Sequence, residues 1–176
     1  TTIKTGYISV SAEPVPVIQP PGPISMVYGE SALLDGGADF ASWLWNTGET
    51  TQQIIVSDCG EYSVEVEDMN GCSGAASVVV SVSPVVTFDF VVLISTPATS
   101  YQWLLNGIPI VGATGQTFAP TISGDYSVQV LCQGTGWINS NVVPVTMIII
   151  GLSETPPAQI KIYPNPATDI IFLKSN

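Results

Sequence analysis

The sequence contains no arginine and no histidine, and among its 176 residues the only basic side chains are Lys4, Lys161 and Lys174. Its 14 acidic residues leave a formal net charge of −11. A protein that binds nucleic acid or an anionic membrane surface neutralises phosphates with lysine and arginine. The shortage of cations therefore argues against nucleic acid and against anionic membrane surfaces, and we expect no nucleic acid partner.

Long apolar runs are also missing. Mean hydropathy is +0.41, yet no run reaches the ~18 residues that a membrane-spanning helix needs. The two longest candidates, 85–94 and 142–152, are interrupted by Asp89 and by Pro144. We expect each of these segments to be a buried strand, and we expect no insertion of the chain into a membrane.

The usual groups of a hydrolase active site are scarce. Without histidine, a serine or cysteine nucleophile lacks its usual base. Glu65 and Glu67 would be a carboxylate pair of the kind that glycosidases use. They lie two residues apart on one face of a predicted strand, with Val64 and Val66 on the other, which is typical of a solvated strand face. We therefore expect the chain not to be an enzyme.

What the chain does have is the composition of short strands joined by tight turns. It contains 16 glycines and 14 prolines, with many Val, Ile, Ser and Thr residues. An internal repeat accompanies this composition. Trp45 aligns with Trp103 and Tyr62 aligns with Tyr126, and in each copy the tyrosine begins an alternating tyrosine–valine pattern of one strand face.

The repeated residues resemble those of immunoglobulin-like sandwiches. A tryptophan on one strand is followed by D-x-G-x-Y on a later one, as in Asp58-x-Gly60-x-Tyr62. The resemblance implies a buried tryptophan and a tyrosine whose hydroxyl bonds back to the chain. Two residues after each tyrosine, where antibody domains carry a disulfide cysteine, stand Val64 and Val128. The fold class expected is all-β, with tandem immunoglobulin-like β-sandwich domains connected by short Pro-rich linkers.

The pattern also predicts individual strands and turns. Turns are expected at 68–71 and at Asn106-Gly107, where asparagine and glycine tolerate positive φ, and at 134–136. The strands expected in the first copy are 24–28, 31–35, 41–46, 51–57, 60–67 and 73–82. Those expected in the second copy are 85–94, 100–105, 108–111, 116–119, 125–131 and 141–150.

Proline-rich segments suggest where the chain divides. Residues 1–12 contain KTGYISV, which resembles the closing strand of PKD-like domains, so we expect them to be the last strand of a preceding domain. The first immunoglobulin-like domain is expected at 13–83, opening with an extended linker over 13–23. The second is expected at 84–151. The remaining residues, 152–176, would hold another linker and the start of a further domain.

The C-terminal tail carries a more specific motif. Its strand–turn–strand pattern is centred on Tyr163, Pro164, Asn165 and Pro166. The segment IYPNPATD resembles the opening of the type A C-terminal sorting domain of type IX secretion substrates in the Bacteroidota. The family's domain continues through further strands, so this would be a truncated start. The resemblance implies the type IX secretion machinery as a partner and an extracellular or outer cell-surface location.

Three cysteines remain to be placed. Cys59 and Cys72 flank the predicted strand 60–67, which separates them by roughly 25 Å or more at ~3.3 Å per residue, beyond disulfide reach. With Cys132 the count is odd, so at least one cysteine is a free thiol or bonds to another chain. Because the disulfide positions of the antibody fold are valines, we expect small buried thiols.

Acidic residues concentrate in the first copy. Oxygen ligands without nearby cations suit Ca²⁺, although no spacing matches an EF-hand. The alternative is surface acidity that keeps an apolar protein soluble. No other cofactor is expected. The calcium candidates are Asp35 and Asp39 in one loop and Glu67, Asp68 and Asn70 in a hairpin.

One aromatic residue is a candidate for sugar binding. Trp137 lies in a glycine-rich hairpin, where no core role requires it. An exposed indole there would stack on a glycan ring. The alternative is that it packs within the hairpin.

The leading functional hypothesis is a non-catalytic structural or adhesive stalk, or spacer, of an exported bacterial cell-surface protein. A variant of it is side-by-side assembly into a filament through exposed edge strands. The alternative is a carbohydrate- or calcium-binding accessory module of a secreted enzyme.

Overall fold

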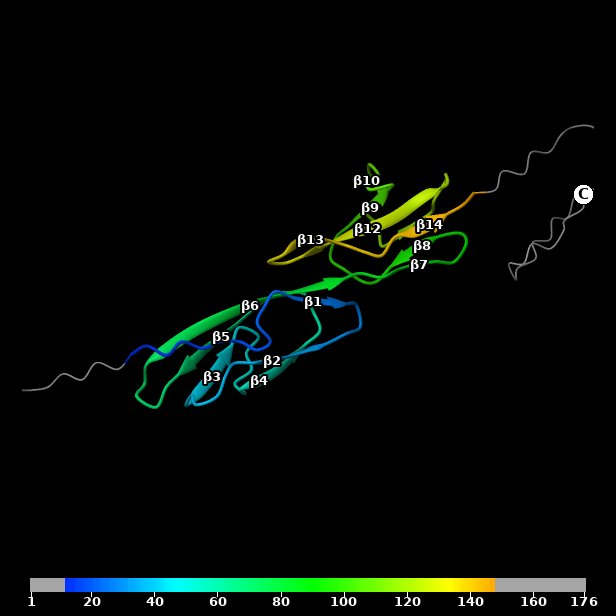
Figure 1. Cartoon of the computed structure of the whole chain (residues 1–176). Coiled ribbons are helices and arrows are strands. Elements are labelled where there is room, and N and C mark those ends of the chain that lie inside the picture. The colour runs from blue at the N-terminus through cyan, green and yellow to red at the C-terminus, as the bar shows by residue number, and fades with distance from the viewer. Residues whose placement is uncertain (1–11, 148–176) are drawn as a thin grey trace, which may run out of the picture.

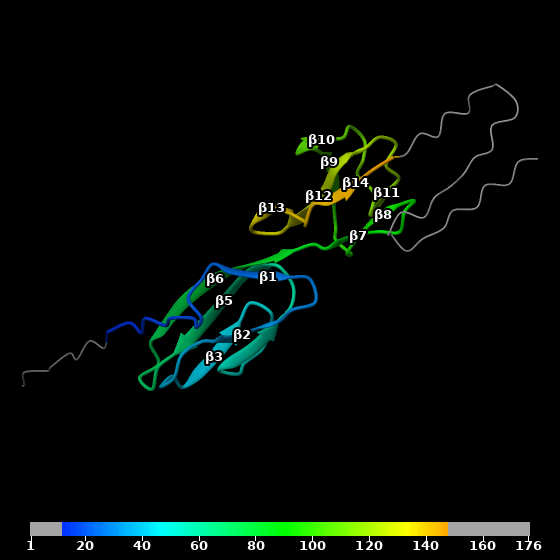
Figure 2. The ribbon, with the colours of Figure 1, turned by 45° about the vertical axis from the view of Figure 1, so that its right-hand side comes forward.

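The computed structural model describes residues 12–147, and within that range it contains fourteen strands and no helix. The strands form two β-sandwiches placed end to end (Figures 1 and 2). We call residues 12–83 module 1 and residues 84–147 module 2. Each module has its own apolar core, and the two cores share no residue.

Module 1 packs a sheet of four strands on a sheet of two. In the larger sheet, the strands that come first and last in the sequence are neighbours and run parallel. The other neighbouring strands of this sheet are antiparallel. In spatial order the larger sheet contains β1 (Ile24–Val27), β6 (Ser73–Ser83), β5 (Gly60–Glu67) and β3 (Ser42–Trp45). The smaller sheet contains β2 (Ala32–Asp35) and β4 (Gln53–Val56).

Module 2 packs a sheet of five strands on a sheet of three. In the larger sheet the last segment of the module is split into two strands that both pair with β12. The larger sheet contains β10 (Ile108–Pro109), β9 (Tyr101–Leu105), β12 (Gly124–Cys132), β13 (Gly136–Asn139) and β14 (Val143–Val145). The smaller sheet contains β7 (Val86–Phe88), β8 (Leu93–Ser95) and β11 (Thr117–Phe118).

The two tryptophans expected in the cores are buried, with Trp45 1% and Trp103 0% exposed. Burying an indole leaves its N–H in need of an acceptor. Trp45 donates to the carbonyl of Thr51 at 2.9 Å, and Trp103 donates to the carbonyl of Gly115 at 2.8 Å. The repeat thus places an equivalent, fully hydrogen-bonded indole at the centre of each module.

Both modules contain a tyrosine corner, in which a tyrosine hydroxyl donates a hydrogen bond to a backbone carbonyl a few residues upstream. The Tyr62 hydroxyl donates to the carbonyl of Asp58, and the Tyr126 hydroxyl donates to the carbonyl of Ile122, each at 2.9 Å. Both bonds span four residues, so the second module keeps the corner although Ile122 replaces the aspartate. The backbone carbonyl is the acceptor, which makes the side chain at that position dispensable.

Strand alternation in module 1 follows the prediction. Tyr62, Val64 and Val66 are buried along β5, whereas Glu65 and Glu67 are exposed. This confirms that the two glutamates lie on the solvated face of the sheet. The predicted turns at 68–71, Asn106-Gly107 and 134–136 are also confirmed, with Asn106 at φ 52° and Gly107 at φ 78°.

Two strand predictions in module 2 are wrong. The segment 85–94 is two strands, β7 and β8, separated by a turn at Phe90 with φ 73°. The Asp89 carboxylate accepts hydrogen bonds from the backbone N–H groups of Val92 and Val91, which closes this turn and lowers the pKa of Asp89. Residues 136–139 pair as β13, and only 143–145 of the predicted strand 141–150 form β14; residues 148–150 lie outside the described range.

The segment 13–23 is not a free linker. Ile18 is 4% exposed, and Gln19 exchanges two backbone hydrogen bonds of 2.9 Å with Asp35. At the start of the segment, the carbonyl of Pro14 lies where a Cβ atom at Gly74 would be, so the segment passes close to β6. Proline prevents a longer ladder here, but apolar side chains still pack the segment onto module 1. The junction between the modules is likewise no long linker, since β6 leads to β7 through Pro84 and Val85.

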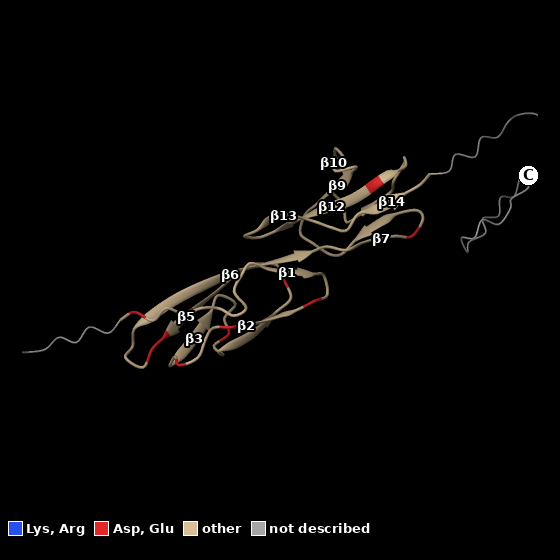
Figure 3. Ribbon diagram, viewed as in Figure 1, with Lys and Arg blue, Asp and Glu red and all other residues tan. Residues whose placement is uncertain are grey.

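The acidic residues divide unevenly between the modules (Figure 3). Module 2 carries only Asp89 and Asp125. All the other acidic residues of the described range belong to module 1, and no Lys, Arg or His lies anywhere between residues 12 and 147. Within this range every carboxylate must be stabilised by water or by hydrogen bonds from neutral groups.

No helix within residues 12–147 is long and apolar enough to cross a bilayer. The predicted closing strand at the N-terminus, apart from Ala12, and the whole predicted sorting motif, Tyr163 to Pro166, lie outside the described residues.

Candidate functional site

The junction between the modules is the part of the structure that the repeat alone does not explain. Because the modules follow each other head to tail, β5 begins at the junction and runs away from it, whereas β12 ends there (Figure 1). Cys59 is the residue before β5, and Cys132 is the last residue of β12. The stacking therefore brings together two cysteines from opposite ends of equivalent strands.

Cys59 and Cys132 form a disulfide bond with their Cα atoms 5.8 Å apart and 73 residues apart in sequence. This Cα distance is within the range that disulfides adopt. The expectation of buried thiols was wrong for these two cysteines. Cys72 is the free thiol that the odd count allows, and no bond joins it to Cys59.

Sequence reasoning missed this pairing because it considered the disulfide of a single sandwich. A signal was nevertheless present in the repeat. Cys59 aligns with Ser123, and Cys132 aligns with Asp68, so each cysteine is unique to its module. A pair of cysteines at opposite ends of one repeated strand indicates a bond between neighbouring modules.

The turn between β12 and β13 also lies against module 1. A Cβ atom added at Gly134 would be 3.4 Å from the backbone nitrogen of Glu61, and β13 contacts β6. Gly134 has φ 84°, which few other residues adopt easily. Glycine here permits both the turn and the close approach of the two backbones.

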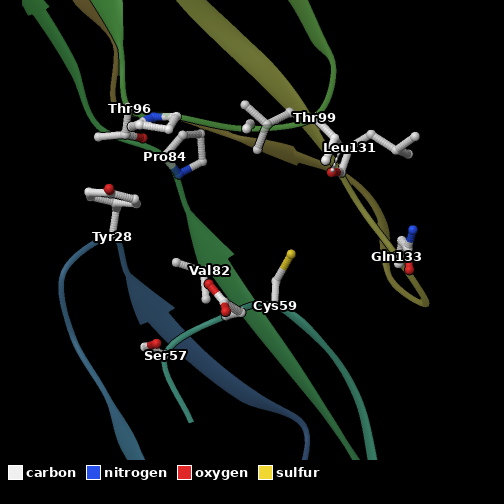
Figure 4. A pocket seen from close by; sticks show the side chains of 13 residues that line it. Tyr28, Ser57, Cys59, Val82, Pro84, Thr96, Thr99, Leu131 and Gln133 are labelled. Atoms are coloured by element: carbon white, nitrogen blue, oxygen red, sulfur yellow. Dashed lines mark hydrogen bonds between the residues drawn. The ribbon is translucent and has the colours of Figure 1, made fainter. Parts of the chain in front are cut away.

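Beside the disulfide, the two modules enclose an open hollow of about 290 Å³ (Figure 4). Module 1 contributes Tyr28 and Ser57 to its wall, and module 2 contributes Thr96, Thr99 and Leu131. Most of these groups are hydroxyl-bearing or apolar. The hollow marks where the modules meet without filling the space between them.

The phenol of Tyr62 lies next to this junction. Burial raises the pKa of Tyr62, and the negative charges of Asp58 and Glu49 raise it further. The hydroxyl therefore keeps its proton at neutral pH and remains a donor to the Asp58 carbonyl. The corner that orients the start of β5, and with it Cys59, does not change with pH near neutrality.

Two of the calcium candidates, Asp35 and Asp68, already accept hydrogen bonds with their carboxylate oxygens. The Asp35 carboxylate accepts from the side-chain amides of Gln53 and Gln52 and from the N–H of Gly37, and these donors lower its pKa. Asp39 lies in the same loop, in the left-handed region at φ 70°.

In the hairpin, Asp68 accepts from the N–H groups of Cys72 and Asn70 and from the Asn70 side chain, which lowers the pKa of Asp68. Glu67 ends the strand just before this turn and is exposed. Among residues 12–147 no three or more His, Cys, Asp or Glu side chains are grouped so that they could hold a metal ion. Calcium binding stays a prediction.

Trp137, the glycan candidate, lies on β13 and is 50% exposed. Its strand partner is Leu131, which is 39% exposed on the same face of the sheet. Glycan binding at this residue also stays a prediction.

No family model matches the chain, and no curated protein matches it. Among solved structures it is similar to murine CEACAM1b, at 14% identity and a TM-score of 0.30, over 76% of this chain and 99% of that one. It is similar to the N-terminal Ig1-2 module of the Drosophila receptor protein tyrosine phosphatase DLAR, at 12% identity and a TM-score of 0.28, over 76% and 99%.

A third similar structure is SGBP-B of the Bacteroides ovatus mixed-linkage glucan utilization locus, in complex with a mixed-linkage heptasaccharide. The identity is 17% and the TM-score 0.28, over 77% of this chain and 48% of that one. At such scores these matches carry no argument about function. The chain's own strand order, core tryptophans and tyrosine corners identify it as a tandem of immunoglobulin-like β-sandwiches.

Proposed function

We propose that this chain is a non-catalytic, load-bearing spacer of an exported bacterial cell-surface protein. The observation that carries this proposal is the disulfide between Cys59 and Cys132, which joins the two modules. A bond inside one sandwich would stabilise that sandwich alone. A bond between sandwiches limits their relative movement and reduces the length of chain that tension can extend.

The disulfide also changes how the chain carries tension. A pull on the two ends passes along the backbone to Cys59, crosses to Cys132 and leaves through the C-terminal end of module 2. The residues between the two cysteines are bypassed. They comprise β5, β6 and most of module 2. At ~3.5 Å per residue, this sequence separation of 73 residues corresponds to about 25 nm of chain that tension cannot extend.

The disulfide and the tail both support the proposed location. Disulfides form and persist in oxidising compartments such as the cell exterior. The motif from Tyr163 to Pro166 resembles the start of a type IX sorting domain, which supports the type IX secretion machinery as a partner and the Bacteroidota as the source. The spacer would then separate a preceding domain from the cell surface.

The filament variant stays a prediction within this proposal. Edge strands such as β3 and β10 have one unpaired side and would be the joints. Opposing this, module 1 carries most of the acidic residues of residues 12–147 and no cation, so like charges repel when copies approach. We therefore expect association, if it occurs, to strengthen with salt.

Single-molecule force spectroscopy on the full 176-residue chain tests the load-bearing role. The oxidised protein should release about 25 nm less chain on unfolding than the Cys59→Ala/Cys132→Ala double variant or the reduced protein. Cys72→Ala is the matched control, because it removes a thiol and leaves the disulfide intact.

Equal extension of the oxidised protein and the double variant would show that the disulfide bears no load. The spacer proposal would then lose its support. If the double variant also released about 25 nm less chain than full unfolding requires, a mechanically resistant core would explain the shortening. That result would also contradict the proposed role of the bond.

A further inference from the structure

We propose that the outer face of the larger sheet of module 2 binds uncharged polysaccharide. Its stacking residue would be Trp137, with a row of side-chain amides beside it. This role goes beyond the spacer function and does not depend on it. We call the surface the amide face, and it consists of Gln102, Gln129, Leu131, Trp137 and Asn139.

The strand register places these five side chains together. Gln129 on β12 lies directly opposite Gln102 on β9 and Asn139 on β13. Two residues farther along β12, Leu131 lies opposite Trp137. Residues opposite one another across an antiparallel pair share a face, and so do residues two apart on one strand.

This face points away from the core. Trp103, Val128 and Val130 alternate with the residues of the amide face, and all three are buried in the core of module 2. Trp137 is 50% and Leu131 39% exposed, and neither belongs to the core cluster. A half-exposed indole next to an exposed leucine is apolar surface that the fold of module 2 does not require.

The amides are held in place and still have unused hydrogen-bonding groups. Gln102 donates to the carbonyls of Trp103 and Ile110, at 2.9 and 2.8 Å, and Gln129 donates to the side-chain oxygen of Asn139 at 2.9 Å. Within residues 12–147 the Asn139 amide nitrogen donates no hydrogen bond, and the side-chain oxygens of Gln102 and Gln129 accept none. One donor group and two acceptors remain for a ligand.

Sugars offer the complementary chemistry. A pyranose ring has a face of C–H bonds, which suits the electron-rich face of an indole. Its rim carries hydroxyl groups that donate to and accept from side-chain amides. The three amides follow one another across neighbouring strands at ~4.8 Å spacing. Such a row beside Trp137 lines the path of a short stretch of polysaccharide.

The charges of the described residues favour an uncharged sugar over an anionic one. Strands β9, β12 and β13 carry a single charged residue, Asp125, at the far end of β12 from Leu131. No Lys, Arg or His lies within residues 12–147, so an anionic glycan would find no cation and would be repelled by the acidic residues (Figure 3). A second copy of this chain carries the same net negative charge and is disfavoured for the same reason.

Affinity electrophoresis of the 176-residue chain tests the proposal, with hydroxyethyl cellulose, galactomannan and dextran as uncharged probes and carboxymethyl cellulose as an anionic one. At least one uncharged probe should retard the protein, and carboxymethyl cellulose should not. Trp137→Ala should weaken binding about tenfold or more, equivalent to about 1.4 kcal/mol. Asn139→Ala should weaken it less.

Phe90→Ala is the matched control. Phe90 lies in the turn between β7 and β8 and is 80% exposed. The substitution therefore removes an exposed aromatic ring that lies outside the amide face. It should bind as the wild type does. Far-UV circular dichroism shows that each variant is folded.

Several outcomes would overturn the proposal. They are no retardation by any of the three uncharged probes, wild-type binding by Trp137→Ala, or equal loss in Phe90→Ala, which would indicate non-specific adhesion. If sedimentation shows instead that Trp137→Ala dissociates a dimer, the face is a contact between copies. All of these results leave the force measurement, and hence the spacer proposal, unaffected.

Discussion

Module 1 and module 2 share their core but differ in their last strands. Each buries one tryptophan and closes one tyrosine corner in the same relative positions. Module 1 ends in a single strand of 11 residues, β6, whereas module 2 ends in the two short strands β13 and β14. The difference shows that the tryptophan and tyrosine define the sandwich, while the segment after the tyrosine strand can form one long strand or two short ones.

The two modules also differ on the solvent-facing side of β5 and of its equivalent, β12. The exposed positions Glu65 and Glu67 on β5 align with Gln129 and Leu131 on β12. The first pair is charged and solvated, and the second is neutral and lies beside Trp137. One repeat therefore keeps this face in water, and the other leaves it suited to an uncharged partner.

Removing the core indoles tests whether the two cores are equivalent, and it should have the largest effect. We expect Trp45→Ala and Trp103→Ala each to lower the free energy of unfolding by about 3–5 kcal/mol, because each leaves a large cavity. Urea unfolding followed by circular dichroism measures this loss. Trp137→Ala is the control, since it removes a half-exposed indole and should cost much less. If one core tolerated its loss, the modules would not be equivalent.

The tyrosine corners provide a finer test. Tyr62→Phe and Tyr126→Phe each remove one hydrogen bond to a backbone carbonyl, so each should lower the free energy of unfolding by about 1 kcal/mol. We expect the larger loss at Tyr126, which is 1% exposed compared with 9% for Tyr62. Tyr28→Phe is the matched control, because this ring is 49% exposed. A loss in the control as large as in the corner variants would contradict a special role for the corner.

The smallest effect concerns an acidic residue of module 1. Hydrogen bonds from Gln53, Gln52 and Gly37 lower the pKa of Asp35 in the folded state. Its contribution to stability is therefore fully present above the pKa of an unfolded aspartate, about 3.9, and is lost as pH falls through the lowered folded value. We expect Asp35→Asn to be less stable than wild type near neutral pH, and the difference to shrink on acidification below about pH 4.

Thermal unfolding of both proteins across this range measures the difference. Asp39→Asn is the control for the removal of one negative charge from this part of module 1, because the amides of Gln52 and Gln53 donate to Asp35 and not to Asp39. If the difference in stability between Asp35→Asn and wild type were the same at every pH, the charge of the Asp35 carboxylate would not be what stabilises the loop.

Much of the fold could be predicted because it follows from local patterns. The alternation Tyr62, Val64, Val66 has the period of a strand with one buried face, and Asn106-Gly107 suits a tight turn. The prediction failed where a side chain rather than a pattern makes the turn, as with Asp89 inside an apolar run. It also failed for 13–23, where prolines suggested a linker but Ile18 packs into the core.

The candidate site was less accessible from sequence than the fold. Trp137 stood out because it lies in a glycine-rich hairpin, but Gln129 and Gln102 come from β12 and β9, and no local signal specifies the register of these strands. Side-chain type can suggest a binding residue. Only the pairing of strands shows which other residues complete the site.

By itself the sequence determined two sandwiches, their buried tryptophans and tyrosines, and the lack of cations between residues 12 and 147, because burial and charge depend on residue type and period. The tertiary structure alone decided that Cys59 pairs with Cys132 and that the amide face is assembled. Both require residues distant along the chain to meet. Whether they meet depends on the stacking of modules and the register of strands, which are set by many contacts acting together and not by any short segment.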